Sequence, residues 1–119
     1  MYKFEKLEVW NLSIEFADRI YEIAEKLPEL EKYNLASQII RSSTSISLNI
    51  AEGSTGQSDA EQNRFLGMAL RSLIETVACL KILERRNYVD NETVQAIYEF
   101  SQKLFAKLTA FRRSIKSKN

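Results

Sequence analysis

The stretch NLASQIIRSSTSISLNIAEGSTGQSDAEQ, from Asn34 to Gln62, decides the fold. Its middle is rich in serine, threonine and isoleucine, whose helix propensity is modest. A strand of this length needs strict alternation of apolar and polar residues, and residues 38–43 do not alternate. Steps of four and three, the spacing of one helix face, instead connect Leu35, Ile39, Ser42, Ile46, Asn49 and Gly53. The pattern predicts a helix with a thin, serine-lined face that lets a neighbouring helix approach closely.

The residues after this helix predict where it ends and where the next helix begins. Gly53 stands where a left-handed glycine commonly closes a helix, and residues 54–57 read as a loop. Ser58 and Glu61 have the spacing of a capping box, which predicts a helix starting directly after Ser58. The apolar seam of that next helix consists of Phe65, Ala69, Ser72, Thr76, Cys79 or Leu80, and Leu83.

Helical periodicity also covers the two ends of the chain. The last segment, capped by Asp90 or Asn91, has a seam formed by Val94, Ile97, Ser101, Leu104, Leu108, Phe111 and Ile115. The first segment ends at Pro28 and has one seam formed by Leu7, Trp10, Ile14, Ala17, Tyr21 and Ala24. We therefore predict an all-α fold, with residues 1–119 forming one up-down-up-down four-helix bundle domain.

The first segment carries more apolar surface than one bundle core needs. A second stripe lies beside its seam and consists of Val9, Phe16, Ile20, Ile23 and Leu27. An extra apolar face favours a homo-oligomer, because exposed apolar patches usually contact a partner. The alternative is a monomer in which both stripes together form one wide core-facing surface.

Composition indicates an ordinary soluble protein of the cytoplasm. The 119 residues are 45% hydrophobic and 28% charged, and they include no histidine and a single cysteine, Cys79. One cysteine cannot form an intramolecular disulfide and fits a reducing compartment. Neither a signal-like leader nor an apolar run of membrane-spanning length occurs, so we expect no membrane contact.

Charge is distributed unevenly along the chain, although the formal net charge is only +1. The first 32 residues hold five basic and eight acidic residues, whereas residues 101–119 hold six basic residues and no acidic one. The basic tract predicts contact with RNA or DNA, or else a solvated cationic helix end. The candidate nucleic-acid-binding residues are Arg85, Arg86, Lys103, Lys107, Arg112, Arg113, Lys116 and Lys118.

The residue types present argue against catalysis. Without histidine, a histidine-based triad, a zinc–histidine site and a Glu-x-x-His di-iron site are all excluded. Cys79 lies in an apolar seam, and the serines of residues 42–47 have no lysine or histidine nearby in sequence to activate them. Glu52 and Glu75 alone are a weak metal signal, and no glycine-rich phosphate loop occurs. We expect a protein that is not an enzyme and has no cofactor or metal.

A polar stripe follows the serine-rich helix and is expected to face the interior. Its members on this helix are Gln38, Arg41, Ser45, Asn49 and Glu52. Glu75 of the next helix also belongs to the stripe, and it shares one face of that helix with Arg64 and Arg71. Buried polar groups need hydrogen-bond partners, so the stripe predicts a satisfied network that fixes helix register, with Asn49 and Glu52 holding the two helices together. A solvated groove face and a contact surface for a ligand or partner are the alternatives.

These residues also carry a resemblance to a known family. Gln38-x-x-Arg41, Ser45, the run Asn49-Ile50-Ala51-Glu52-Gly53, and then Phe65, Ala69, Ser72 and Glu75 resemble the 23S rRNA intervening-sequence protein family. The opening Phe4-x-x-Leu7-x-Val9-Trp10 and the Leu27-Pro28 before Tyr33 and Leu35 fit the same family. The resemblance spans nearly the whole chain.

This resemblance implies a four-helix bundle that often assembles as a barrel-like homopentamer, mostly with no established activity. The family is similar to the accessory variability determinant of diversity-generating retroelements, which binds nucleic acid and a reverse transcriptase. Two function classes follow for this chain. One is a non-enzymatic oligomer that contacts RNA or DNA through a basic surface, and the other is a protein-binding scaffold with no nucleic-acid contact.

Overall fold

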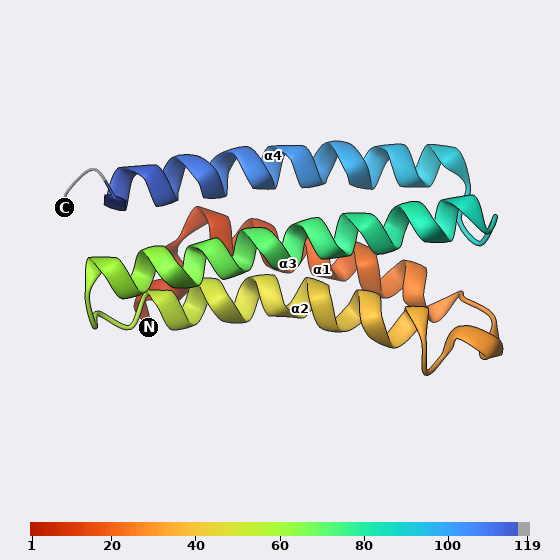
Figure 1. The fold of residues 1–119 in the computed structure, drawn as a ribbon, viewed down its shortest axis with the longest axis horizontal. Coiled ribbons are helices and arrows are strands. Elements are labelled where there is room, and N and C mark those ends of the chain that lie inside the picture. The colour runs from red at the N-terminus through yellow and green to blue at the C-terminus, as the bar shows by residue number, and fades with distance from the viewer. Residues whose placement is uncertain (117–119) are drawn as a thin grey trace.

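The computed structural model describes residues 1–116, and within them the chain is all-α (Figure 1). Four long helices follow one another: α1 (Glu8–Glu25), α2 (Leu35–Gly53), α3 (Asp59–Arg85) and α4 (Asn91–Lys116). Short 3-10 helices, η1 (Lys3–Lys6) and η2 (Glu29–Glu31), precede α1 and α2. The described residues form no strand, so the predicted all-α class is confirmed.

The helix ends follow the predicted signals with one exception. The Ser58 hydroxyl caps α3 by accepting a hydrogen bond from the Glu61 backbone N–H at 3.0 Å. Asn87, with φ of 63°, closes α3 in the left-handed conformation. Gly53 is not left-handed, as its predicted cap role requires, but lies in the last turn of α2. A Cβ on Gly53 would come within 3.0 Å of the Phe65 Cβ, so this glycine serves the close contact between α2 and α3.

The four helices lie roughly parallel to the long axis of a body that measures 46 × 23 × 22 Å (Figure 1). Helices adjacent in the chain pack side by side, and α1 also packs on α4. Because the backbone of α1 does not closely approach that of α3, and α2 does not closely approach α4, these pairs occupy the diagonals of the bundle. Within the described residues, no helix is long and apolar enough to cross a membrane.

The core of α1 comes mainly from its second predicted stripe. Val9, Phe16, Ile20 and Ile23 are buried, together with Ala17 and Ala24 from the first stripe. Leu7, Trp10 and Ile14 are only half-buried, and Tyr21 is exposed. The α4 seam is confirmed, since all of its predicted members are buried except the half-buried Phe111. The two α1 stripes thus form one wide surface with a core centre and less buried flanks.

Hydroxyl groups connect the serine-lined face of α2 to both of its neighbours. The Thr76 hydroxyl of α3 donates to the Ser42 hydroxyl at 2.8 Å, and the Ser72 hydroxyl donates to that of Ser45 at 3.0 Å. Ser47 and Ser13 of α1 share a hydrogen bond at 2.9 Å. The Ser13 and Ser42 hydroxyls also donate to a carbonyl one turn back in their own helix. The Ser72 carbonyl lies 2.8 Å from the Thr76 hydroxyl as an alternative acceptor, so these polar groups are satisfied inside the bundle.

A second polar contact joins two connections at one end of the bundle. Glu31 of η2 is buried, and its carboxyl group accepts hydrogen bonds from the Asn34 amide at 2.9 Å and the Tyr88 hydroxyl at 3.1 Å. Tyr88 belongs to the connection between α3 and α4, whereas Glu31 belongs to the connection between α1 and α2. One carboxyl group therefore ties together two connections that are far apart in sequence.

Candidate functional site

The structure distributes the predicted nucleic-acid-binding residues over two ends of the bundle. Arg85 and Arg86 are exposed at the C-terminal end of α3, while Arg112 and Arg113 lie near the C-terminal end of α4. Because α3 and α4 run in opposite directions, these two pairs are at opposite ends of the long axis (Figure 1). The candidate basic residues therefore do not form one continuous patch on a single copy of the chain.

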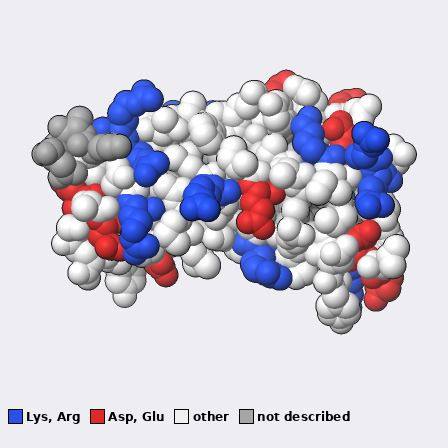
Figure 2. Space-filling view, in the orientation of Figure 1, with Lys and Arg blue, Asp and Glu red and all other residues white. Residues whose placement is uncertain are grey.

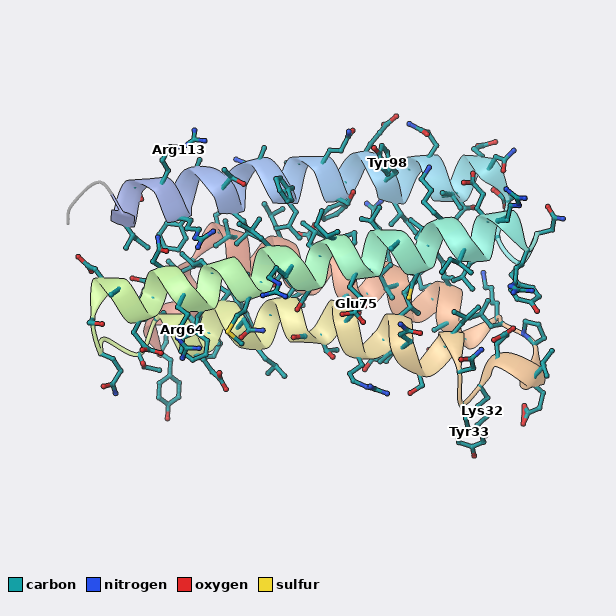
Figure 3. All side chains as sticks on the ribbon, in the orientation of Figure 1. Lys32, Tyr33, Arg64, Glu75, Tyr98 and Arg113 are labelled. Atoms are coloured by element: carbon teal, nitrogen blue, oxygen red, sulfur yellow. The ribbon has the colours of Figure 1, made fainter. Side chains whose placement is uncertain are left out.

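Several members of the basic tract have partners inside the protein. The Lys107 ammonium lies 3.3 Å from the Glu8 carboxylate of α1. Arg112 is half-buried, and its guanidinium donates to the backbone carbonyl and the side-chain oxygen of Asn63 at 3.2–3.3 Å. Lys103 and Arg113 are exposed, and Figure 3 shows Arg113 pointing away from the bundle. The side chain of Lys116 and the whole of Lys118 lie outside the described residues.

Gly67 of α3 has no side chain and so leaves the space that the Arg112 guanidinium occupies. A Cβ at this position would lie 2.8 Å from a terminal nitrogen of the Arg112 guanidinium. The glycine thus lets the guanidinium come close to α3 and reach Asn63 one turn earlier. Arg112 consequently connects α3 to α4 and is not a freely extended phosphate ligand.

The surface between α3 and α4 is hollowed along the middle of the molecule. One hollow of about 500 Å³ is lined by Arg64, Met68, Arg71 and Arg112 around Gly67 and Leu70. A second, of about 350 Å³, lies between Val77 and Tyr98. Ile74 and Phe105 line both hollows, so the two hollows adjoin each other. We call the two adjoining hollows the α3–α4 groove.

Apolar side chains of the α3–α4 groove are open to solvent. Met68 and Phe105 are each 38% exposed, and Ile74 is 56% exposed. Figure 2 shows basic groups spaced along this face with uncharged surface between them and one acidic group at mid-length. That carboxylate is Glu75, which Figure 3 places between α3 and α2. The groove therefore combines an apolar floor with a mainly arginine rim.

The α3–α4 groove was not predicted from the sequence, although Arg64 and Arg71 were placed on one helix face, because the groove forms only where α4 packs on α3. Arg64, Met68 and Arg71 are spaced four and three residues apart, and such residues share one face of a helix. An apolar residue between two arginines on an otherwise outward face was the signal available. Exposed apolar residues were instead expected on the first helix, where only Tyr21 among the large ones is exposed.

The predicted interior polar stripe is correct only in its middle. Asn49 is buried and donates to the Ser45 carbonyl at 2.8 Å and the Ser45 hydroxyl at 3.1 Å, and Ser45 in turn accepts from Ser72 of α3. The prediction is wrong for the remaining members, which are exposed: Gln38, Arg41, Glu52 and Glu75. The stripe follows the flank of α2, and α3 covers that flank only near Ser45 and Asn49.

The nucleophile considered from sequence lies in the core. Cys79 is buried in α3, and burial, followed by the negative charge of nearby Glu75, raises the pKa of its thiol. The thiol therefore stays protonated at neutral pH, and a protonated thiol is a poor nucleophile. Glu52 and Glu75 are both exposed, and no group of three metal-ligating side chains occurs within residues 1–116.

The geometry defines an all-α bundle of four antiparallel helices with a groove between the last two. The sequence pattern of the 23S rRNA-intervening sequence protein family matches residues 5–110. A crystal structure of a protein of unknown function from the S23 ribosomal protein family of Bacteroides thetaiotaomicron is similar, with a TM-score of 0.81 and 33% identity. The similarity covers 87% of this chain and 97% of that chain. Among curated proteins, none matches this chain.

Together these findings show the family. The chain belongs to the 23S rRNA-intervening sequence protein family, as the resemblance in the Asn49–Gly53 region predicted.

Proposed function

We propose that this protein is a non-enzymatic bundle that functions as a homo-oligomer. The observation that carries the proposal is the α3–α4 groove, in which Met68, Ile74 and Phe105 are exposed together. Contiguous apolar surface with a polar rim is typical of protein–protein interfaces. The family resemblance implies a homopentamer, and the absence of histidine together with the protonated Cys79 thiol favours a role without catalysis.

The mass of the protein in solution tests this proposal. Light scattering at micromolar concentration should give several times the chain mass of 13.8 kDa, with five times that mass expected for a pentamer. Ile74→Asp should shift the mass towards the monomer, because it places a carboxylate in the apolar part of the groove. Gln38→Asp is the control, since Gln38 is exposed on α2 and lines neither hollow of the groove. A monomeric wild type would exclude the homo-oligomer.

Contact with nucleic acid is a second candidate function, supported by the exposed Lys103 and Arg113 of α4 and by the basic excess of residues 101–119. Repetition of these groups around an oligomer would raise the total affinity through effective concentration. A reverse transcriptase partner, implied by the resemblance to the retroelement accessory protein, belongs to this candidate.

A titration separates this candidate from a scaffold without nucleic-acid contact. Labelled RNA and duplex DNA should bind with little sequence preference, and binding should weaken steeply with salt because counterions are released. Lys103→Glu/Arg113→Glu should abolish binding, whereas Lys3→Glu/Lys6→Glu, with the same charge change elsewhere, should not. Arg112 is unsuitable for this test because it holds Asn63. Binding that is absent at low salt, or indifferent to the first variant, would favour the scaffold.

A further inference from the structure

The outward face of α3 presents two positive charges on either side of an apolar side chain. Arg64, Met68 and Arg71 follow one another at steps of four and three residues, and all three are exposed. Arg71 forms no ion pair within the described residues. Arg64 pairs with Glu61 in its own helix, but this pair is solvent-exposed and therefore weak. Both arginines are available to a negatively charged partner.

Helix α1 presents the complementary sequence of groups. Asp18, Tyr21 and Glu25 are all exposed and are spaced three and four residues apart. Neither carboxylate takes part in an ion pair within residues 1–116. The other carboxylates of α1 include Glu8, which binds Lys107, and Glu22, which borders a hollow towards α4. The row of Asp18, Tyr21 and Glu25 is thus a separate negative face with an aromatic centre.

The two rows match when the helices run antiparallel. Read from Arg64 forwards the steps are four and three, and read from Glu25 backwards they are also four and three. Each row spans two helical turns, about 10 Å along the axis. This register places Glu25 at Arg64, Tyr21 at Met68 and Asp18 at Arg71.

A parallel arrangement fits less well. Its matching steps of four and three would join Asp18, Glu22 and Glu25, and would set the charged Glu22 on the apolar Met68. Burying an unpaired carboxylate against apolar surface is unfavourable, whereas a thioether against an aromatic ring is favourable. The antiparallel register is therefore the better one.

From these matching rows we infer that the occupant of the Arg64–Arg71 side of the α3–α4 groove is α1 of a second copy of this chain, in the antiparallel register. The inference rests on the proposed self-association and names its interface. Because α1 and α3 lie on a diagonal of the bundle, their two exposed faces belong to different sides of one copy. Each copy thus offers a donor face and an acceptor face, and such a head-to-tail interface closes into a ring when its rotation allows.

Charge reversal tests the pairing of Asp18 with Arg71. Asp18→Arg and Arg71→Asp should each weaken self-association at least about tenfold, because like charges then face each other at every interface. The double variant Asp18→Arg/Arg71→Asp restores one opposite pair per interface and should regain the wild-type mass. Glu99→Arg and Lys103→Asp, both exposed on α4, are the matched controls and should leave the mass unchanged. Sedimentation or light scattering over a concentration series measures these effects, with circular dichroism to confirm helix content.

Each outcome bears on one specific statement. A monomeric wild type overturns self-association and with it this interface. A wild-type oligomer that is indifferent to both single variants leaves self-association standing and overturns the α1-to-groove interface. Single variants that dissociate without rescue in the double variant overturn the Asp18–Arg71 register. Dissociation by each single variant together with rescue by the double supports the inference.

Discussion

Helix α3 packs in two different ways on its two chain neighbours. Towards α2, small side chains allow close approach, and hydroxyl pairs such as Thr76–Ser42 hydrogen-bond across the contact. Towards α4, the larger Ile74 and Phe105 leave a hollow groove whose apolar groups remain exposed. The size of the residues at each contact therefore decides how completely that side of α3 is covered. The side with small residues closes within the bundle, and the side with large residues is left incomplete within one chain.

The largest effect is expected from enlarging a residue on the closed side. Ser42→Leu should lower the free energy of unfolding by about 2–3 kcal/mol, because the added carbons overpack the contact and the Thr76–Ser42 hydrogen bond between α3 and α2 is lost. Ala106→Leu makes a similar increase in size on the open side and should change stability by less than about 0.5 kcal/mol. Urea denaturation of both variants measures the difference. Equal destabilisation would show that the two sides of α3 are packed alike.

A smaller effect is expected from Asn49, which supports the closed side through Ser45. Asn49→Ala should lower the free energy of unfolding by about 1 kcal/mol, since it removes two hydrogen bonds at a buried position. Gln38→Ala, at an exposed position of the same predicted stripe, is the control and should be near neutral. If Asn49→Ala left the melting temperature unchanged but abolished self-association or nucleic-acid binding, Asn49 would be a contact residue instead.

The stability of α4, the helix that borders the open side of α3, should depend on acid, because the Asp90 carboxylate caps its N-terminal end. The Asp90 carboxylate accepts a hydrogen bond from the Thr93 backbone N–H at 2.7 Å, which lowers its pKa below the ordinary value of 3.8. A group whose pKa is lower in the folded state stabilises the fold above its unfolded pKa. That contribution is lost as the pH falls through the folded pKa.

Backbone amides at the start of α4 should therefore lose protection against hydrogen exchange, relative to their intrinsic rate at the same pH, when the pH falls below the ordinary range of aspartate. Amides at the α2–α3 contact should stay protected. Asp90→Asn keeps a capping side chain without the charge, so it should flatten this pH dependence. A loss of protection that is equal in all four helices would contradict a local effect at α4.

The smallest effect is expected at Gly67, where α3 meets Arg112. Gly67→Ala gains helix propensity of up to about 1 kcal/mol but displaces the guanidinium from Asn63, so the net change should stay within about 0.5 kcal/mol. In an Arg112→Ala background the same change should be clearly stabilising, because only the propensity gain remains. Thermal denaturation of the four combinations measures the coupling. Additive effects would mean that Arg112 does not depend on this glycine.

Sequence periodicity predicted the helices and most of the core, because a helix must bury one face whatever its neighbours are. It did not predict which flank of a helix is covered, since that depends on helices far away in sequence. Gln38 and Asn49 share a predicted stripe, yet only Asn49 is buried. The groove was missed for the same reason: Arg112 joins Arg64 and Arg71 only once α4 packs on α3.

The contact between Glu31 and Tyr88 gives the bundle two unequal ends. At one end, the buried Glu31 carboxyl group belongs to one connection and accepts a hydrogen bond from Tyr88 of the other. At the other end, the α2–α3 connection stands alone, and its residues 55–58 are all exposed. Local unfolding should then begin at the end of the bundle that holds the α2–α3 turn. The serine-lined contact separates as this opening proceeds, and its hydroxyl pairs let α2 and α3 close again in a single register.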